Sequence, residues 1–265
     1  MSPDSVTRLA PAPRLPGRAE ERGRATTPRV AVVEDHGLFA EALEVALGLQ
    51  HHEVHRVPLA DHTMTTGQLL TAVLRSDPDL VLLDLDLGAA GNGMHVIPPL
   101  TEAGVPVVVF TGSVDPARWG ESVELGAVAV LPKTTPLATM LATLRRIGEG
   151  HSVLEPRLRD TWLRAFHQEA DHTHATRDRL DSLTTREREV LAHLMAGHQV
   201  RDIARSSSVA ETTVRSQVKA ILAKLHVTSQ IGAVGAAYNA RWRPPVLPTT
   251  PEFTDFRDAA GALHP

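Results

Sequence analysis

The sequence contains no cysteine, no long apolar run and no apolar segment near its start. Without cysteine there can be neither disulfides nor thiolate metal sites, and a reducing compartment is permitted. A membrane-spanning helix needs about 20 predominantly apolar residues, and no run approaches that length. The first 29 residues are rich in Pro and Arg but lack the apolar core of a secretory signal. We therefore expect no membrane partner, and a disordered tail over residues 1–28.

Length and charge distribution indicate two domains of different character. With 265 residues and 42% hydrophobic content, the chain can bury a sizeable core. Residues 30–150 carry 6 basic and 15 acidic side chains, a net charge of −9. Residues 180–243 carry 9 basic and 5 acidic side chains, a net charge of +4. Only the second region is therefore suited to a polyanionic partner.

Between residues 29 and 150, short aliphatic runs alternate with helical patterns. The runs predict strands at 30–34, 53–57, 79–84, 105–111 and 127–132. The intervening patterns predict helices near 37–49, 65–76, 94–103, 115–125 and 136–149. Five such units favour an α/β fold, a doubly wound five-stranded parallel sheet of the flavodoxin-like kind with helices on both faces. The strand at 53–57 alternates in polarity, which is typical of an edge.

Polar side chains stand where four of these strands end. Asp84 follows the third strand, Glu34 and Asp35 follow the first, and Thr111 and Lys133 close the fourth and fifth. The carboxyl ends of parallel strands are where open α/β sheets place their chemistry. Three carboxylates close together need a cation, and hard oxygen ligands suit Mg²⁺. Such a group can position and neutralise a phosphoryl group that is attacked by a carboxylate.

Four motifs carry a resemblance to a known family: Val30-Ala31-Val32-Val33-Glu34-Asp35-His36, Leu82-Leu83-Asp84-Leu85, Val108-Val109-Phe110-Thr111 and Leu131-Pro132-Lys133. Together they cover about residues 29–150 and resemble the receiver domain of two-component response regulators. The resemblance implies that Asp84 accepts a phosphoryl group from a histidine kinase. It implies a Mg²⁺ site made of oxygen ligands, namely the carboxylates of Glu34, Asp35 and Asp84 and the main-chain carbonyl of Asp86. Thr111 and Lys133 would bind the phosphoryl oxygens.

Two positions depart from that family. Receivers usually carry Tyr or Phe three residues before the lysine, where this chain has Val130. A Pro commonly follows the lysine, where this chain has Thr134. The first departure leaves open a second hypothesis, a DNA-binding regulator whose switch is degenerate and independent of phosphorylation.

A phosphatase is a third hypothesis for the same strand ends. Asp84-Leu85-Asp86 resembles the paired aspartates of haloacid-dehalogenase-type phosphatases, with Asp84 as nucleophile and Asp86 as general acid/base. Those enzymes also need an acid pair after a later strand. None follows Thr111 or Lys133, so we expect no enzyme of this class.

Residues 151–179 are polar and predict a linker that is partly helical around 158–166. His167, His172 and His174 make a metal site conceivable there, although a solvated linker is the favoured interpretation. After Arg243, three prolines within 244–248 end the second domain, and residues 244–265 predict a mobile tail.

The basic region from 180 to 243 predicts a small all-α, helix-turn-helix domain. Thr184 and Glu187 form a capping-box pattern at the start of a helix that Gly197 ends. A short helix covers 200–205, and a two-faced third helix runs from about 211 to 225. Its polar face predicts a DNA contact, with Arg215, Ser216 and Lys219 near the bases and Thr212, Thr213 and Lys224 on phosphates.

The motifs of this region resemble the LuxR-type DNA-binding domain: Leu183-Thr184-x-Arg186-Glu187-x-Glu189-Val190-Leu191, Ile203-Ala204, Thr213-Val214-Arg215 and Leu222-x-Lys224-Leu225. A receiver followed by this module resembles the NarL-type response regulators. The resemblance implies a bacterial, cytoplasmic transcription factor that is not an enzyme, binds double-stranded DNA and is a homodimer when active. Ala210 departs from it, because the family often has a Ser or Thr there to cap the recognition helix.

Overall fold

The computed structural model describes residues 27–59 and 64–244. These residues form two compact units that divide between His167 and Gln168. The expected tails, 1–28 and 244–265, lie almost entirely outside the described residues. None of the helices within 27–59 and 64–244 combines the length and the apolar character that crossing a bilayer requires.

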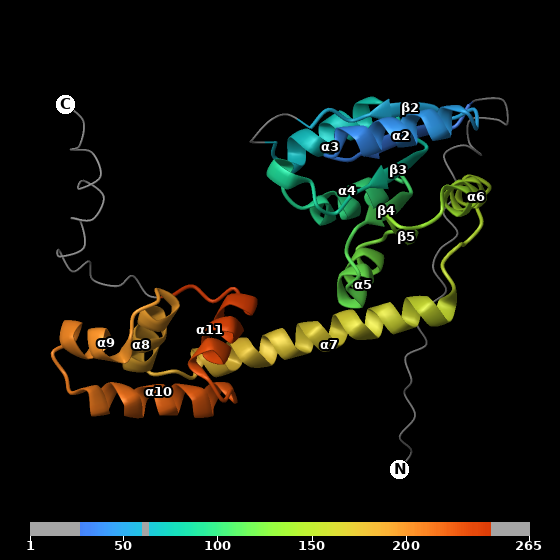
Figure 1. The fold of residues 1–265 in the computed structure, drawn as a ribbon. Coiled ribbons are helices and arrows are strands. Elements are labelled where there is room, and N and C mark those ends of the chain that lie inside the picture. The colour runs from blue at the N-terminus through green and yellow to red at the C-terminus, as the bar shows by residue number, and fades with distance from the viewer. Residues whose placement is uncertain (1–26, 60–63, 245–265) are drawn as a thin grey trace, which may run out of the picture. The chain divides into compact units, whose positions relative to one another are not determined.

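The first unit is built on a five-stranded parallel sheet in the order β2-β1-β3-β4-β5 (Figure 1). The strands are β1 (Arg29–Val33), β2 (Glu53–Arg56), β3 (Leu80–Leu83), β4 (Val107–Thr111) and β5 (Ala129–Pro132). Each expected strand is present, and β2 is at the edge that its alternating sequence predicted. The expected doubly wound parallel sheet is therefore confirmed.

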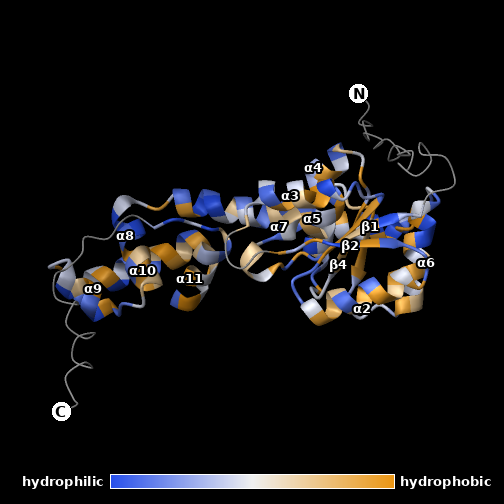
Figure 2. Ribbon diagram, turned by 90° about the horizontal axis from the view of Figure 1, so that it is seen from above, coloured by the Kyte–Doolittle hydropathy of each residue, from blue (hydrophilic) through white to orange (hydrophobic). Residues whose placement is uncertain are grey.

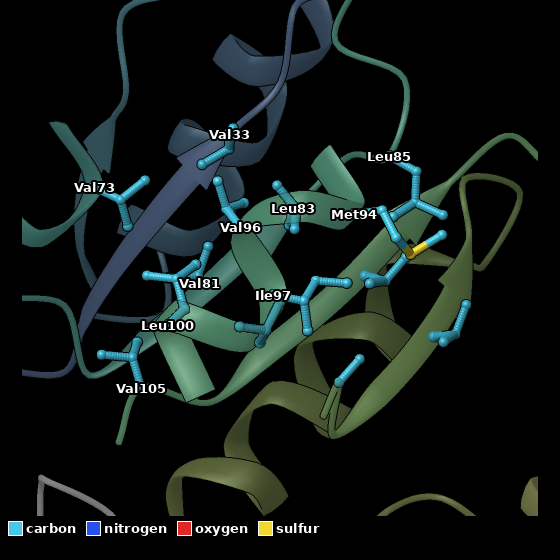
Figure 3. Close-up of a cluster of buried hydrophobic side chains, with 14 of the residues drawn as sticks. Val33, Val73, Val81, Leu83, Leu85, Met94, Val96, Ile97, Leu100 and Val105 are labelled. Atoms are coloured by element: carbon cyan, nitrogen blue, oxygen red, sulfur yellow. The ribbon is translucent and has the colours of Figure 1, made fainter. Parts of the chain in front are cut away.

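The three central strands are apolar except for Arg29 at the start of β1 and Thr111 at the end of β4, because both faces of the sheet are covered. One face packs Ala31, Val81 and Val109 against α3 (Thr66–Arg75), α4 (Ile97–Glu102) and α5 (Pro116–Glu124). The other packs their neighbours, such as Val32 and Leu82, against α2 (Gly37–Gly48) and α6 (Leu137–Gly148). Figure 3 shows part of the first cluster, and Figure 2 shows the two helical layers on either side of the apolar sheet.

The helix expected at 94–103 is divided in the structure. A 3₁₀ turn, η2 (Gly93–Val96), precedes α4, and prolines occupy the first turn of α4 itself. Proline fits a first helical turn because its missing N–H has no intrahelical partner there. The division brings Gly93 against the main chain of Asp84, which matters for the site described below.

The expectation of a partly helical linker over 151–179 was wrong in extent. Residues Pro156–Asp181 form one helix, α7, of 26 residues. Pro156 begins it, and the next 25 residues contain neither Pro nor Gly, so nothing in the local sequence interrupts the helix. Trp162 and Leu163 are buried in the core of the first unit, and Leu180 in that of the second. Among the described residues, the three histidines of this helix belong to no cluster of three candidate metal ligands.

The second unit contains the end of α7 and four further helices: α8 (Thr185–Met195), α9 (Val200–Ser206), α10 (Glu211–Leu225) and α11 (Gln230–Asn239). The three expected helices share a common core. It includes the fully buried side chains of Val190 on α8, Ile203 on α9 and Ile221 on α10. A fourth helix, α11, was not predicted; Ser229 caps it, and it adds Ala233 and Ala237 to the core.

Candidate functional site

Asp84 lies directly after β3 and is almost entirely buried. Its carboxylate accepts a hydrogen bond from the Asp86 main-chain N–H at Oδ1 (3.3 Å) and from the Lys133 ammonium at Oδ2 (2.7 Å). The following loop comes back against it: a Cβ built on Gly93 would lie 2.2 Å from the Asp84 carbonyl oxygen. Only glycine permits this approach, so the loop between β3 and α4 fixes the main chain of Asp84.

The acids that follow β1 meet Asp84 at the same edge of the sheet. Glu34, Asp35, His36 and Asp84 each offer one ligand atom, and these four atoms all lie within 4.8 Å of one another. The carboxylates are hard oxygen donors of the kind Mg²⁺ takes, and the exposed side of the cluster leaves room for water ligands. Gly88 has a φ of +53° and lies so close that a Cβ would be 2.7 Å from Asp35 Oδ2. The residues present therefore fit a hydrated divalent cation.

Lys133 ties two of these acids together. Its ammonium lies 2.7 Å from Glu34 Oε2 and 2.7 Å from Asp84 Oδ2. Burial lowers the pKa of Lys133, but the hydrogen bonds that its ammonium donates to Asp84 and Glu34 outweigh burial and hold that pKa above its usual value. Burial raises the pKa of Asp84, and the hydrogen bond from Lys133 reduces that rise without cancelling it. Lys133 therefore stays a cation, beside a carboxylate that needs positive charge around it.

Thr111 completes the set that the sequence analysis singled out. It ends β4 and is fully buried, and its carbonyl accepts the Lys133 main-chain N–H at 2.8 Å. Its hydroxyl oxygen accepts the Ser113 N–H at 3.1 Å, which leaves the hydroxyl proton free to donate elsewhere. The strand-end residues therefore lie together at one edge of the sheet.

Two residues of this edge were not predicted as site residues. His36 contacts Glu34 Oε1 at 2.9 Å and Asp35 Oδ1 at 2.8 Å, and its hydrogen bond with Glu34 raises the pKa of the imidazole. Phe39 stacks on Phe110 with ring centroids 5.3 Å apart, and the Lys133 ammonium lies 5.2 Å from the Phe39 ring centroid. The His36 contact could have been expected from its position beside two acids, whereas the Phe39 contact depends on tertiary packing.

Arg118 was also missed, and it bears on the phosphatase hypothesis. Its guanidinium, on α5, donates two hydrogen bonds to the Asp86 carboxylate, one of them at 3.0 Å. These bonds hold the pKa of Asp86 below its usual value. A general acid needs a pKa near the working pH, so Asp86 is poorly suited to protonate a leaving group.

The expected DNA-binding face is exposed on the first half of α10. Five of the six proposed contact residues are exposed there, namely Thr212, Thr213, Arg215, Ser216 and Lys219. The Arg215 guanidinium lies 3.0 Å from the Glu211 carboxylate. Ala210 occupies the N-cap with extended backbone and no side-chain hydrogen bond to the helix.

Lys224 differs from the other five. Its ammonium is 2.7 Å from Glu187 Oε2, and Glu187 also accepts the Thr184 main-chain N–H at 2.7 Å in a capping box. Lys224 therefore joins the end of α10 to the start of α8. This ion pair gives Lys224 a role in the fold, and its expected phosphate contact stays a prediction.

Two family models match this chain. Residues 30–145 match the response regulator receiver domain, and residues 181–237 match the bacterial regulatory proteins of the luxR family. A glycerol metabolism activator from Pseudomonas putida is 29% identical over 218 residues, covering 79% of this chain and 94% of that protein. A nitrate/nitrite response regulator protein homolog from Haemophilus influenzae is 27% identical over 208 residues, covering 77% and 93%. A probable transcriptional regulatory protein NarL from Mycobacterium tuberculosis is 28% identical over 215 residues, covering 80% and 94%. The chain belongs to the response regulators that join a receiver domain to a LuxR-type DNA-binding domain.

Proposed function

We propose that Asp84 accepts a phosphoryl group from a histidine kinase and that its modification controls DNA binding by α10. The observation that carries the proposal is the buried Asp84 carboxylate, which shares the Lys133 ammonium with Glu34 and lies among candidate metal ligands. An isolated buried carboxylate is costly, and this one has both its oxygens held by hydrogen bonds. A carboxylate oriented in this way beside a cation is suited to act as a nucleophile.

In the proposed transfer, an Asp84 oxygen forms a bond to phosphorus while the P–N bond to the kinase histidine breaks. The imidazole nitrogen keeps the electron pair of the broken bond. Lys133 is already placed to neutralise one phosphoryl oxygen, and the Thr111 hydroxyl has a proton to donate to another. Such positioned charges and donors account for most of the catalysis of phosphoryl transfer.

Mg²⁺ would be held by the carboxylates of Glu34, Asp35 and Asp84 and by the main-chain carbonyl of Asp86. When bound, the ion neutralises charge on the phosphoryl oxygens. His36 contacts the carboxylates of Glu34 and Asp35, so its exposed imidazole would compete with the ion for those oxygens.

The DNA contact is proposed for the exposed amino-terminal half of α10. Arg215 and Lys219 would reach base edges in the major groove beside Ser216, while Thr212 and Thr213 would contact phosphates. Two copies would place two such helices on half-sites roughly one helical turn apart. A regulator that works on DNA through a kinase belongs in the bacterial cytoplasm.

Intact-mass measurement after incubation with Mg²⁺ and acetyl phosphate tests the acceptor. We expect the wild-type chain to gain one phosphoryl group and Asp84→Asn to gain none. Asp86→Asn is the matched control, because it removes a neighbouring carboxylate and should still be modified. Modification of Asp84→Asn at the wild-type level would remove Asp84 as the acceptor.

The proposed role of α10 is tested with DNA that the wild-type chain selects from a random pool. The affinity of each variant for this DNA is then measured. Lys219→Ala should weaken binding, and Arg215→Ala should relax the preferred sequence. Arg145→Ala removes the same charge from the exposed surface of α6 and should leave binding unchanged. Unaltered affinity and sequence preference in both α10 variants would exclude this face as the reader.

A further inference from the structure

The first turn of α5 is connected to Thr111 by a short chain of hydrogen bonds. The Trp119 indole N–H donates to the Ser113 carbonyl at 3.0 Å. The N–H of the same Ser113 donates to the Thr111 hydroxyl oxygen at 3.1 Å. One residue, Ser113, therefore links the Trp119 side chain to the hydroxyl proposed to bind a phosphoryl oxygen.

Trp119 also contacts α7. Its ring meets the buried Trp162 edge to face, with centroids 5.1 Å apart and planes at 69°. Next to it, a Cβ on Gly120 would lie 2.1 Å from the Trp162 carbonyl oxygen and 2.9 Å from the Phe166 Cβ. The main chains of α5 and α7 are thus in direct contact, as Figure 1 shows for the green and yellow helices.

We propose that Trp119 is a positioning residue that couples the state of Thr111 to the docking of α7 on α5. The coupling is a change of hydrogen-bond partner. When the Thr111 side chain rotates to bring its hydroxyl to a phosphoryl oxygen, that oxygen leaves the Ser113 N–H, and the Gly112–Ser113 peptide that carries this N–H can rotate. The change in the φ and ψ angles of Ser113 then moves its carbonyl, which holds the Trp119 indole, and the ring contact with Trp162 weakens.

The consequence is a looser amino-terminal part of α7 in the phosphorylated chain. This helix continues to Asp181, and its Leu180 is fully buried in the core of the DNA-binding unit. It is therefore the covalent path along which the receiver can act on that unit. The inference rests on the proposed phosphorylation of Asp84.

Hydrogen–deuterium exchange of residues 156–167 tests the coupling in the full chain, with and without Mg²⁺ and beryllium trifluoride as the phosphoryl mimic. In the wild type we expect the mimic to speed exchange in this segment about fivefold, the effect of losing roughly one aromatic contact. Trp119→Phe keeps a ring against Trp162 but has no N–H to donate to Ser113. In this variant the mimic should bind and leave exchange of 156–167 unchanged.

Gly120→Ala provides a second variant that leaves the Trp119 side chain intact. Its added methyl collides with the Trp162 carbonyl, so exchange of 156–167 should already be fast without the mimic. Trp242→Phe, which alters a tryptophan of the other unit, should respond like the wild type. An equal response in wild type and Trp119→Phe would overturn the coupling, as would a wild type that binds the mimic with no change in α7. Should the wild type neither bind the mimic nor accept phosphate, the proposed function fails first and this inference with it.

Discussion

The contact between Glu187 and Lys224 gives a prediction that separates a structural role for Lys224 from a role in DNA binding. Glu187 is buried at the start of α8, where its Oε2 accepts the Thr184 N–H and the Lys224 ammonium, each at 2.7 Å. Burial alone would raise the pKa of Glu187, but the hydrogen bonds from Lys224 and Thr184 outweigh it and lower that pKa. The ionised carboxylate therefore stabilises the domain.

The magnitude follows from the two partners. Loss of a capping interaction costs about 1 kcal/mol. The Lys224 side chain is 36% exposed, so solvent screens the ion pair and its contribution is about 1 kcal/mol. Glu187→Gln keeps the acceptor for Thr184 and should cost about 1 kcal/mol, whereas Glu187→Ala should cost about 2 kcal/mol. Lys224→Met should cost about 1 kcal/mol, and the double variant should show that the two losses are not additive.

Urea unfolding, monitored by hydrogen exchange of the α8 amides, measures these losses in the free energy of unfolding. The folded pKa lies below the unfolded value of about 4.3. The contribution of Glu187 is therefore complete above that value, and it is lost as the pH falls through the folded pKa. The reasoning would be refuted if Lys224→Met left stability unchanged and lowered DNA affinity instead, since Lys224 would then act on phosphate.

Three further predictions concern single positions. Folding raises the pKa of Asp84, so its negative charge destabilises the metal-free fold above the folded pKa. Asp84→Asn should therefore raise the melting temperature at pH 7. This gain should vanish as the pH falls below the unfolded pKa of about 3.9. A gain that persists at pH 3 would contradict this. Gly93→Ala should lower both stability and phosphoryl uptake, because its Cβ would lie 2.2 Å from the Asp84 carbonyl oxygen. Gly91→Ala is the control, because a Cβ there meets no atom within 4 Å and tests only the strain of a side chain at positive φ. Ala210→Ser should stabilise the helical unit by about 1 kcal/mol in urea unfolding, since the extended N-cap now lacks a side-chain acceptor, and an unchanged midpoint would show that the cap is not limiting.

The sheet and its strand-end residues could be predicted from the sequence because the signal is local and strong. The runs 80–83 and 107–110 are unbroken, apolar and buried on both faces, and the polar residues Asp84 and Thr111 follow them immediately. Parallel pairing then brings Asp84, Thr111 and Lys133 to one edge without further information.

Other features depend on information that local patterns do not contain. α7 is polar overall, and its buried side chains are too few to give a strong helical period, namely Trp162, Leu163, Thr176 and Leu180. The Arg118–Asp86 contact joins residues 32 apart, and the Lys224–Glu187 contact joins residues 37 apart. Long flexible side chains can reach many partners, so the sequence shows which charges are available and not which of them pair. For Lys224 the sequence shows the charge but not the ion pair with Glu187, and its expected phosphate contact stays a prediction.

The most direct test of whether Asp84 controls DNA binding uses the DNA that the wild-type chain selects from a random pool. Affinity for this DNA is measured with and without beryllium trifluoride and Mg²⁺. We expect the mimic to change the affinity of the wild-type chain and to leave that of Asp84→Asn unaltered. A wild-type affinity that stays the same while the mimic is bound would contradict the account, and it would support the alternative of a regulator whose DNA binding is independent of phosphorylation.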